Sequence, residues 1–378
     1  MSTTMLDLKG QPVNPTIQPE NPFTPSFGEI PYSLVGRRDE TRRIVRAFER
    51  TSRDPYLFTL ITGARGTGKT ALLSHASEAA EANGWIAVSA YALPGMLEML
   101  YESALDKAAH IIDVADHARL SSITAGPVGA SWENPAPDQS TWHTRMSRLV
   151  SALSEKGVGI LFTLDEVAPE LDEVIALASS CQLFVREGFK VALYIAGLPR
   201  ATSQLVNHKS VSFLRRAMQF RLGSVSDYDA ELALEKTVLS AGKTLDAAAL
   251  KYAAAATGGY PFMIQLVGYR IWEWGEEHEV LTMDDALRGV DTAQREFEDR
   301  ILAPSYYELS EMDRAFLRAM LEDDGTSALV DIAARMGRGN SYAAQYKRRL
   351  LDQGVIEESY DKRLSFGLPG LREFVAAR

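Results

Sequence analysis

The feature that most constrains this chain is a glycine-rich run between a predicted strand and a predicted helix. Residues 56–62 are a short apolar run followed by glycine, which predicts a buried strand, and residues 70–82 have helical spacing. The run between them fits the eight-residue phosphate-loop (P-loop) pattern, with residues Gly63, Ala64, Arg65, Gly66, Thr67, Gly68, Lys69 and Thr70. A chance glycine-rich turn is the alternative, and the strand and helix on either side favour the P-loop.

Phosphate binding gives a chemical reason for each residue type in the P-loop. Glycines let the backbone turn its N–H groups around a phosphate, at the positive end of the helix that follows. Lys69 is predicted to neutralise the β and γ phosphates, and Thr70 to place its hydroxyl on Mg2+. The P-loop therefore predicts binding of a nucleoside triphosphate.

An acidic pair follows a second apolar strand. Residues 160–164 are all apolar except for one threonine, and Asp165 and Glu166 come directly after them. In a P-loop sheet such a strand end faces the phosphates, so Asp165 is predicted to hold Mg2+ and Glu166 to orient and deprotonate the attacking water. An acidic start of a helix would look the same. The P-loop upstream favours the catalytic interpretation.

Strands and helices alternate through the first two thirds of the chain. Strands are predicted at residues 56–62, 85–90, 159–164, 190–196 and 219–222, and helices at 39–52, 70–82, 93–114, 142–156 and 171–186. Residues 121–140 are rich in Gly, Pro, Ser, Asn and Asp and predict an inserted loop. The fold class is therefore predicted to be α/β, with the parallel sheet of a P-loop NTPase.

The chain divides into four predicted segments. Residues 1–33 carry six prolines and are expected to form an extended arm without a core. Residues 34–225 form the P-loop ATPase core, and residues 226–300 form a helical lid with a break at Gly258 and Gly259. Residues 301–378 form a C-terminal domain.

Composition limits the location and the partners. The single cysteine, Cys181, allows no disulfide within one chain, and neither a leader peptide nor an apolar run that would span a bilayer is recognisable. We therefore expect a cytoplasmic protein without a membrane contact. The formal net charge of −10 argues against coating nucleic acid with the whole surface, because such binding depends on many contacts to phosphates. Any DNA contact is expected to be local.

The P-loop, the acidic strand end and residues 34–40 (LVGRRDE) together resemble the AAA+ origin-recognition ATPases and the related STAND and archaeal-type ATPases. The resemblance implies binding of ATP or ADP with Mg2+, and it places Val35, Gly36 and Arg37 against the adenine. A turn followed by a helix cap is the alternative interpretation of these three residues.

Two further segments resemble parts of the same group. Residues 192–200 look like the strand that carries a polar sensor, but Ala196 and Gly197 occupy its end, which predicts slow hydrolysis because a group that positions water is absent. Residues 258–262 (GGYPF) resemble the Gly-x-Pro element of STAND proteins, whose proline touches the nucleotide, which implies this role for Pro261. A helix break would also explain these residues.

Arg215 and Arg216 lie where AAA+ proteins hold an arginine that reaches the γ phosphate of a neighbouring subunit. The resemblance implies a possible homo-oligomer. A solvated pair on a helix face explains the two residues equally well.

The C-terminal segment resembles a winged helix-turn-helix domain. Helices are predicted at residues 310–321, 328–336 and 341–353, and two wing strands at 355–360 and 363–366. On the third helix, Tyr342, Tyr346 and Leu350 are expected to be core. The candidate contacts to double-stranded DNA are Arg338, Ser341, Gln345, Lys347, Arg348, Lys362 and Arg363.

Two functions remain open at this point. One is an ATPase whose nucleotide state controls a DNA-binding winged helix, and the other is a nucleotide switch that recruits a protein partner without DNA. Residues 309–378 hold eleven Lys and Arg against eleven Asp and Glu, so the domain as a whole is not basic. A metabolic P-loop kinase is disfavoured, because no acceptor pocket is evident.

Overall fold

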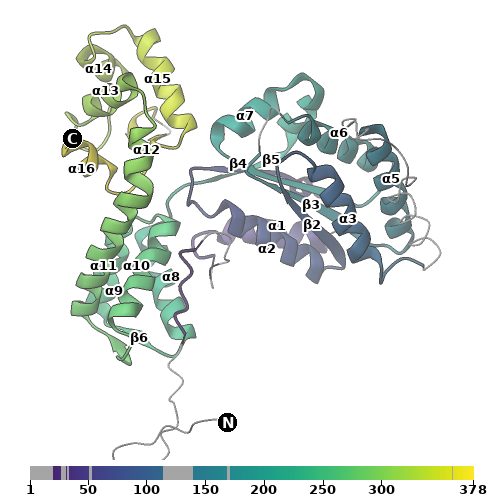
Figure 1. The fold of residues 1–378 in the computed structure, drawn as a ribbon, viewed down its shortest axis with the longest axis horizontal. Coiled ribbons are helices and arrows are strands. Elements are labelled where there is room, and N and C mark those ends of the chain that lie inside the picture. Colours follow the sequence, from purple (N-terminus) through teal and green to yellow (C-terminus); the bar gives the residue numbers. More distant parts are fainter. Residues whose placement is uncertain are drawn as a thin grey trace, which may run out of the picture.

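The computed structural model describes residues 20–26, 31, 34–50, 53–113, 139–167, 171–359 and 361–378. An α/β core is followed by a helical lid and a C-terminal module, and the last two form a column beside the core (Figure 1). Most of the predicted arm at 1–33 and of the insertion at 121–140 lies outside these residues. Within them, no helix combines the length and the apolar character that crossing a bilayer requires.

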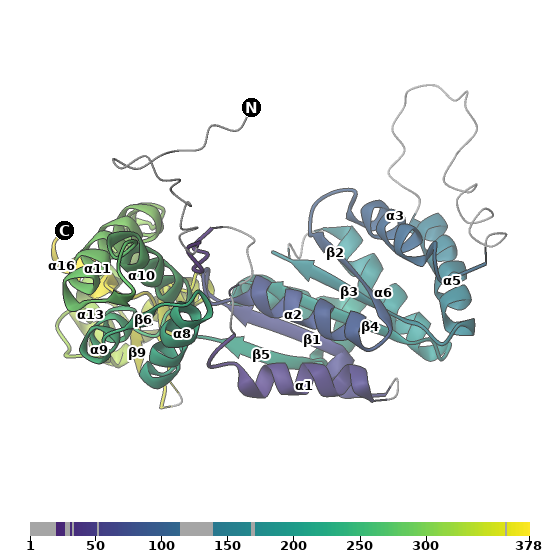
Figure 2. The ribbon, with the colours of Figure 1, turned by 90° about the horizontal axis from the view of Figure 1, so that it is seen from below.

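Five parallel strands form the sheet of the core, in the order β2-β3-β4-β1-β5 (Figure 2). They are β1 (Phe58–Gly63), β2 (Trp85–Tyr91), β3 (Gly159–Asp165), β4 (Val191–Gly197) and β5 (Met218–Leu222). β3 and β4 are buried along their whole length, as strands covered on both faces are. The predicted α/β class with a parallel sheet is confirmed. Because the strands are parallel, the segments after β1 and β3 meet at one edge.

Helices cover both faces of this sheet. One face is packed by α1 (Arg38–Glu49) and α2 (Lys69–Ala82), with Phe48 and Leu72 in the buried layer. The other face is packed by α3 (Met96–Ala108), α5 (Gln139–Glu155), α6 (Asp172–Arg186) and α7 (Pro199–Asn207). Short 3-10 helices at Pro55–Leu57 and Lys209–Arg216 precede β1 and β5.

The lid is helical, as predicted, with one addition. Its helices are α8 (Asp227–Ser240), α9 (Ala247–Ala256), α10 (Pro261–Trp274) and α11 (Met283–Phe297). Two short parallel strands, β6 (Thr244–Leu245) and β7 (Val280–Leu281), were not predicted. α11 runs on through a π-helix, Glu298–Leu302, into α12 (Ala303–Tyr307), so the boundary predicted at residue 300 falls inside a continuous helical run.

The C-terminal module has three helices and then an antiparallel strand pair. These are α13 (Glu311–Met320), α14 (Leu329–Arg335), α15 (Asn340–Asp352), β8 (Ile356–Glu358) and β9 (Leu364–Phe366), followed by an unpredicted α16 (Leu371–Ala376). On α15 the buried residues are Ala343 and Leu350. Tyr342 and Tyr346 are half-buried, with their hydroxyls 3.0 Å apart, and Tyr346 packs against the core, so the predicted core stripe is right for Leu350 and in part for Tyr346.

Part of the proline-rich arm belongs to the lid core, which corrects the expectation of an arm without core residues. Phe23 is 2% exposed and packs among lid residues. A Cβ atom at Gly268 would lie 2.2 Å from its ring, so only glycine leaves room for it. Thr24 N–H donates to Oε1 of Gln265 (3.1 Å), and Asn21 Nδ2 donates to the Tyr269 carbonyl (3.1 Å). The arm is therefore fastened to α10.

Replacing Phe23 by Ala should destabilise the lid by about 3 kcal/mol, because a buried aromatic ring is lost and the space above Gly268 stays open. Urea denaturation followed by circular dichroism measures the change. Tyr252→Ala, on an exposed lid tyrosine, is the control and should change the unfolding free energy by less than about 0.5 kcal/mol. Equal effects of the two substitutions would contradict the docking of the arm.

Candidate functional site

The P-loop occupies the turn between β1 and α2, at the carboxyl edge of the sheet. Gly66 and Gly68 have φ values of +74° and +88°, in the left-handed region that favours glycine. Gly68 is the N-cap of α2 and has no side chain to bond the N–H groups of the first turn. The positive end of α2 is therefore open toward the loop.

Two carbonyls of the loop are bonded from within it. Lys69 Nζ donates to the carbonyl oxygens of Gly63 (3.1 Å) and Ala64 (2.7 Å). The Thr67 hydroxyl also donates to the Ala64 carbonyl (2.9 Å). The ammonium group of Lys69 is thus held over the loop.

The next three carbonyls are bonded by donors from outside the loop. The donors come from the lid and from the segment before α1. They are the Tyr260 hydroxyl to Arg65, the Phe262 N–H to Gly66 (3.1 Å) and the Arg37 guanidinium to Thr67 (3.4 Å). All five carbonyls of residues 63–67 therefore accept a hydrogen bond.

The amide groups of the loop have no such partners. Within the described part of the chain, none of the backbone N–H groups of residues 64–68 donates a hydrogen bond. A trans peptide places C=O and the next N–H on opposite sides, so the carbonyls of residues 65–67, which are bonded from outside the loop, direct the N–H groups of residues 66–68 away from those donors. A row of backbone N–H groups at the start of a helix is a set of donors that a phosphate group fits.

Burial changes the titration of Lys69. Desolvation lowers the pKa of its ammonium group to about 8, although Asp165 and Glu166 act in the opposite direction. Arg65 adds to the lowering. A bound anion would stabilise the charged form and raise this pKa, so the lysine is suited to a phosphate.

The predicted metal ligands meet across the sheet edge. The Thr70 hydroxyl donates to Oδ2 of Asp165 at 2.6 Å, and Asp165 is 8% exposed. A hydroxyl and a carboxylate are ligands that Mg2+ accepts, and it takes further ligands from phosphates and water. No group of three or more His, Cys, Asp or Glu suited to a metal is found among the described residues. The pair therefore fits a cation that is shared with a phosphate.

Glu166 has an unusual backbone. Its φ is +52°, and besides Lys362 it is the only described non-glycine residue with a positive φ. Its own N–H donates to Oδ1 of Asp165 (2.9 Å), and the following Val167 N–H donates to the Ala196 carbonyl (3.0 Å). Such a conformation persists only where neighbours hold it, and it is typical of functional sites.

Two of the three residues predicted to lie against adenine, Val35 and Arg37, line a pocket beside the loop, together with Pro261, the residue predicted to touch the nucleotide. It is lined by Pro31, Leu34, Val35, Arg37, Thr67, Gly68, Ala71, Val225, Ala233, Pro261, Ile264 and Gln265. Gly36 does not line it, and packs against Val225 instead. Arg37 is buried, which lowers its pKa, and it also donates to the Gly223 carbonyl. Its bonds join the loop to the segment after β5.

The predicted arginine pair does not lie at the edge of the sheet that holds the P-loop. Arg215 and Arg216 come before β5, so they lie at the end of the parallel sheet opposite to the P-loop. Arg215 Nε donates to the Val206 carbonyl at 3.3 Å, and both arginines are exposed.

At the end of β4, a Cβ atom on Gly197 would lie 2.5 Å from Val167, which leaves no room for a polar sensor side chain.

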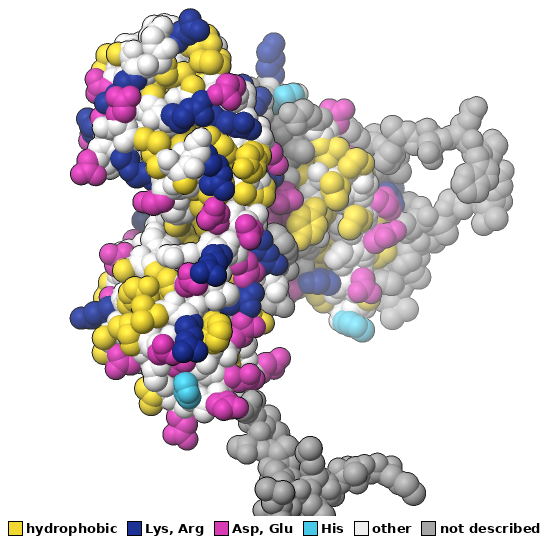
Figure 3. Space-filling view, turned by 60° about the vertical axis from the view of Figure 1, so that its left-hand side comes forward, with side chains coloured by type: hydrophobic (Ala, Val, Ile, Leu, Met, Phe, Trp, Pro, Cys, Tyr) yellow, Lys and Arg dark blue, Asp and Glu magenta, His cyan; other side chains and the backbone are white. Residues whose placement is uncertain are grey.

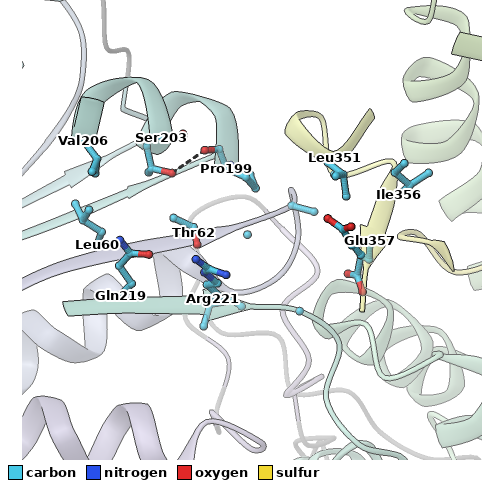
Figure 4. A pocket seen from close by; sticks show the side chains of 17 residues that line it. Leu60, Thr62, Pro199, Ser203, Val206, Gln219, Arg221, Leu351, Ile356 and Glu357 are labelled. Atoms are coloured by element: carbon cyan, nitrogen blue, oxygen red, sulfur yellow. Dashed lines mark hydrogen bonds between the residues drawn. The ribbon is translucent and has the colours of Figure 1, made fainter. Parts of the chain in front are cut away.

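A contact that no sequence pattern indicated joins the C-terminal module to the loop. A Cβ atom at Gly354, where φ is +72°, would lie 2.5 Å from the Cβ of Ala64. Beside this contact a cavity of about 580 Å3 separates β1, β5 and α7 from α15 and β8. Figure 4 shows Gln219 and Arg221 of the core and Glu357 of β8 around it.

The DNA-contact candidates fall into two groups. Lys347 is paired with Glu358 (2.5 Å), Arg363 donates to Thr326, and Arg338 lies over the Tyr342 ring. The candidates that are exposed without a contact of this kind are Ser341, Gln345, Arg348 and Lys362. Basic side chains on the face drawn in Figure 3 are mixed with acidic ones.

Comparison with known protein families gives matches for the core and for the C-terminal module. Residues 33–184 match the AAA ATPase domain, and residues 299–375 match a domain of unknown function (DUF8462). The segment with the P-loop and Asp165 therefore resembles the ATPase domains of the AAA+ kind. A search of the curated proteins finds no significant match.

Solved structures share the whole fold at low sequence identity. The Walker-type ATPase of Pyrococcus abyssi has a TM-score of 0.62 and 13% identity, over 91% of this chain and 96% of that one. The ORC2 protein of Aeropyrum pernix, in its ADPNP-ADP complexes, has a TM-score of 0.60 and 16% identity, over 93% of this chain and 96% of that one. Cdc6p of Pyrobaculum aerophilum has a TM-score of 0.50 and 17% identity, over 93% of this chain and 95% of that one.

Anion binding should weaken above pH 8. Lys69 is charged below its pKa of about 8 and neutral above it, so sulfate affinity should be constant at lower pH and fall about ten-fold between pH 7 and 9. Sulfate keeps its charge over this range, and its affinity is measured from the shift of the melting temperature at matched ionic strength. Lys69→Met should bind sulfate weakly at both pH values. An affinity in the unchanged protein that does not vary with pH would contradict the role of Lys69.

Proposed function

We propose that this chain is an ATP-binding, slowly hydrolysing AAA+/STAND-like ATPase whose nucleotide state controls a C-terminal winged-helix module that binds double-stranded DNA. The five unpaired N–H groups of residues 64–68, next to Lys69, carry the proposal. Such a row of backbone N–H groups is a set of donors that suits an anion.

Several observations support ATP as the ligand. The match of residues 33–184 is to an ATPase domain, and the ORC2 protein with a similar fold was solved in complex with ADPNP and ADP. Val35 and Pro261 line the pocket that also includes Thr67 and Gly68 of the loop. We assign this pocket to the adenine, and Thr70 and Asp165 to Mg2+.

Hydrolysis is proposed to depend on Glu166. Its carboxylate follows β3 beside Asp165, where it would accept a proton from water. The strand end at Ala196 and Gly197 offers no polar side chain to position that water. We therefore expect turnover to be slow, and Mg2+, when bound, to screen the phosphate charge.

The C-terminal module is proposed to be the DNA-binding part. Its order of three helices and two antiparallel strands is that of a winged helix, with α15 as the recognition helix. Ser341, Gln345 and Arg348 lie on one exposed face of α15. The packing of Gly354 on Ala64 supplies a direct link to the P-loop, so a ligand that moves the loop would also move the module.

A second candidate is a nucleotide switch that recruits a protein partner or assembles with copies of itself. The pairing of Lys347 with Glu358 and of Arg363 with Thr326 favours it, because these side chains are used within the module. Exposure of Arg215 and Arg216 is compatible with a contact to a neighbouring subunit.

Two substitutions separate binding from hydrolysis. Lys69→Ala should weaken ATP binding about 100-fold, since a charge-assisted bond to phosphate is lost. Glu166→Gln should keep the affinity and lower kcat about 100-fold, since only the base is lost. Calorimetry and phosphate release measure the two quantities. The exposed residues Lys236 and Glu187 supply the matched controls, Lys236→Ala and Glu187→Gln. Full ATP affinity in Lys69→Ala would contradict the site.

DNA binding should depend on ATP and on α15. A labelled duplex should bind more tightly with ATP than without it. Arg348→Ala should weaken binding and reduce the slope of log affinity against log salt by about 1, because one phosphate contact is lost. Lys251→Ala, on an exposed lid residue, is the control. No binding at low salt, together with ATP-dependent oligomerisation, would select the second candidate.

A further inference from the structure

The turn that leads into α10 is fixed from both sides. Gly258 and Gly259 have φ values of +55° and +66°. The Val225 N–H donates to the Gly259 carbonyl (2.7 Å), and a Cβ atom at Gly259 would lie 2.0 Å from the Val225 carbonyl oxygen. This turn therefore holds the start of α10 against the segment after β5.

Tyr260 projects from this turn onto the P-loop. Its side chain is 2% exposed, and its ring meets Phe297 edge-on with centroids 5.8 Å apart. The hydroxyl donates to the Arg65 carbonyl. Burial raises the pKa of this hydroxyl well above its usual range, so it stays a donor at any working pH.

The helix start supplies a second donor. Pro261 is the first residue of α10 and has no N–H, so Phe262 carries the first available N–H of the helix. This group donates to the Gly66 carbonyl at 3.1 Å. A Cβ atom at Gly66 would lie 3.0 Å from Phe262 and from the Tyr260 ring, so the loop and the lid are in close contact.

We infer that Tyr260 is a positioning residue of the P-loop: its hydroxyl, together with the Phe262 N–H, fixes the outward carbonyls of Arg65 and Gly66 and so directs the N–H groups of residues 66 and 67 toward the phosphates. The inference rests on the proposed function for the identity of the anion. Closure of the lid thus orders two of the five N–H groups, and lid closure and phosphate binding favour each other by the same factor.

The test is Tyr260→Phe, which removes the hydroxyl and keeps the ring. The control is Tyr252→Phe, on an exposed lid tyrosine. Calorimetry should give an ATP dissociation constant about ten-fold higher in Tyr260→Phe and unchanged in the control. The kcat at saturating ATP should stay within about two-fold, because Glu166 is untouched. A general loss of structure would lower kcat as well.

Amide hydrogen exchange without nucleotide gives an independent measure. The Phe262 N–H, which donates to the Gly66 carbonyl, should exchange faster in Tyr260→Phe than in the unchanged protein and in Tyr252→Phe, because the contact between loop and lid is loosened. Added ATP should slow exchange of residues 257–266 in the unchanged protein more than in Tyr260→Phe. Unchanged affinity and unchanged exchange of the Phe262 N–H would overturn the inference. If the unchanged protein binds no ATP, the proposed function fails, and exchange of the Phe262 N–H alone decides on the role of Tyr260.

Discussion

The orientation of five consecutive peptide groups is the constraint on which the rest of the site depends. Left-handed backbone at Gly66 and Gly68 permits the turn, but it does not choose which side the N–H groups face. That choice is made by donors to the carbonyls of residues 63–67. Once the carbonyls of residues 65–67 are bonded from outside the loop, planarity leaves the N–H groups of residues 66–68 facing away from the lid and from Arg37, where a phosphate could accept from them.

The donors that bond the carbonyls of the P-loop come from several parts of the chain. Arg37 precedes the first helix of the core, whereas Tyr260 and Phe262 belong to the lid. Gly354 adds a packing contact from the C-terminal module. Each part of the fold therefore touches the P-loop directly. A ligand that binds one state of the loop better than another has a physical route to the lid and to the module through these contacts.

The features that were predictable from the sequence are those with a local pattern. The P-loop lies between a strand and a helix, and Asp165 ends a buried strand, so the parallel sheet brings Asp165 to Thr70. The bond between Tyr260 and Arg65 spans 195 residues and leaves no local pattern. Proline content predicted an arm without core residues, yet one ring above Gly268 is enough to fasten it, because the lid core has space there.

The edge at β3 and β4 is the basis for proposing that binding is favoured over turnover. Gly197 faces Val167 so closely that a side chain at residue 197 would require the Val167 side chain, just after β3, to shift. That end is itself fixed, because Val167 bonds to Ala196 and the preceding Glu166 is held in a left-handed conformation. A sensor side chain would therefore displace Val167, the residue next to Glu166, which we propose as the general base. With Glu166 acting alone, a bound triphosphate would persist, and persistence suits a protein that uses its nucleotide to hold a conformation.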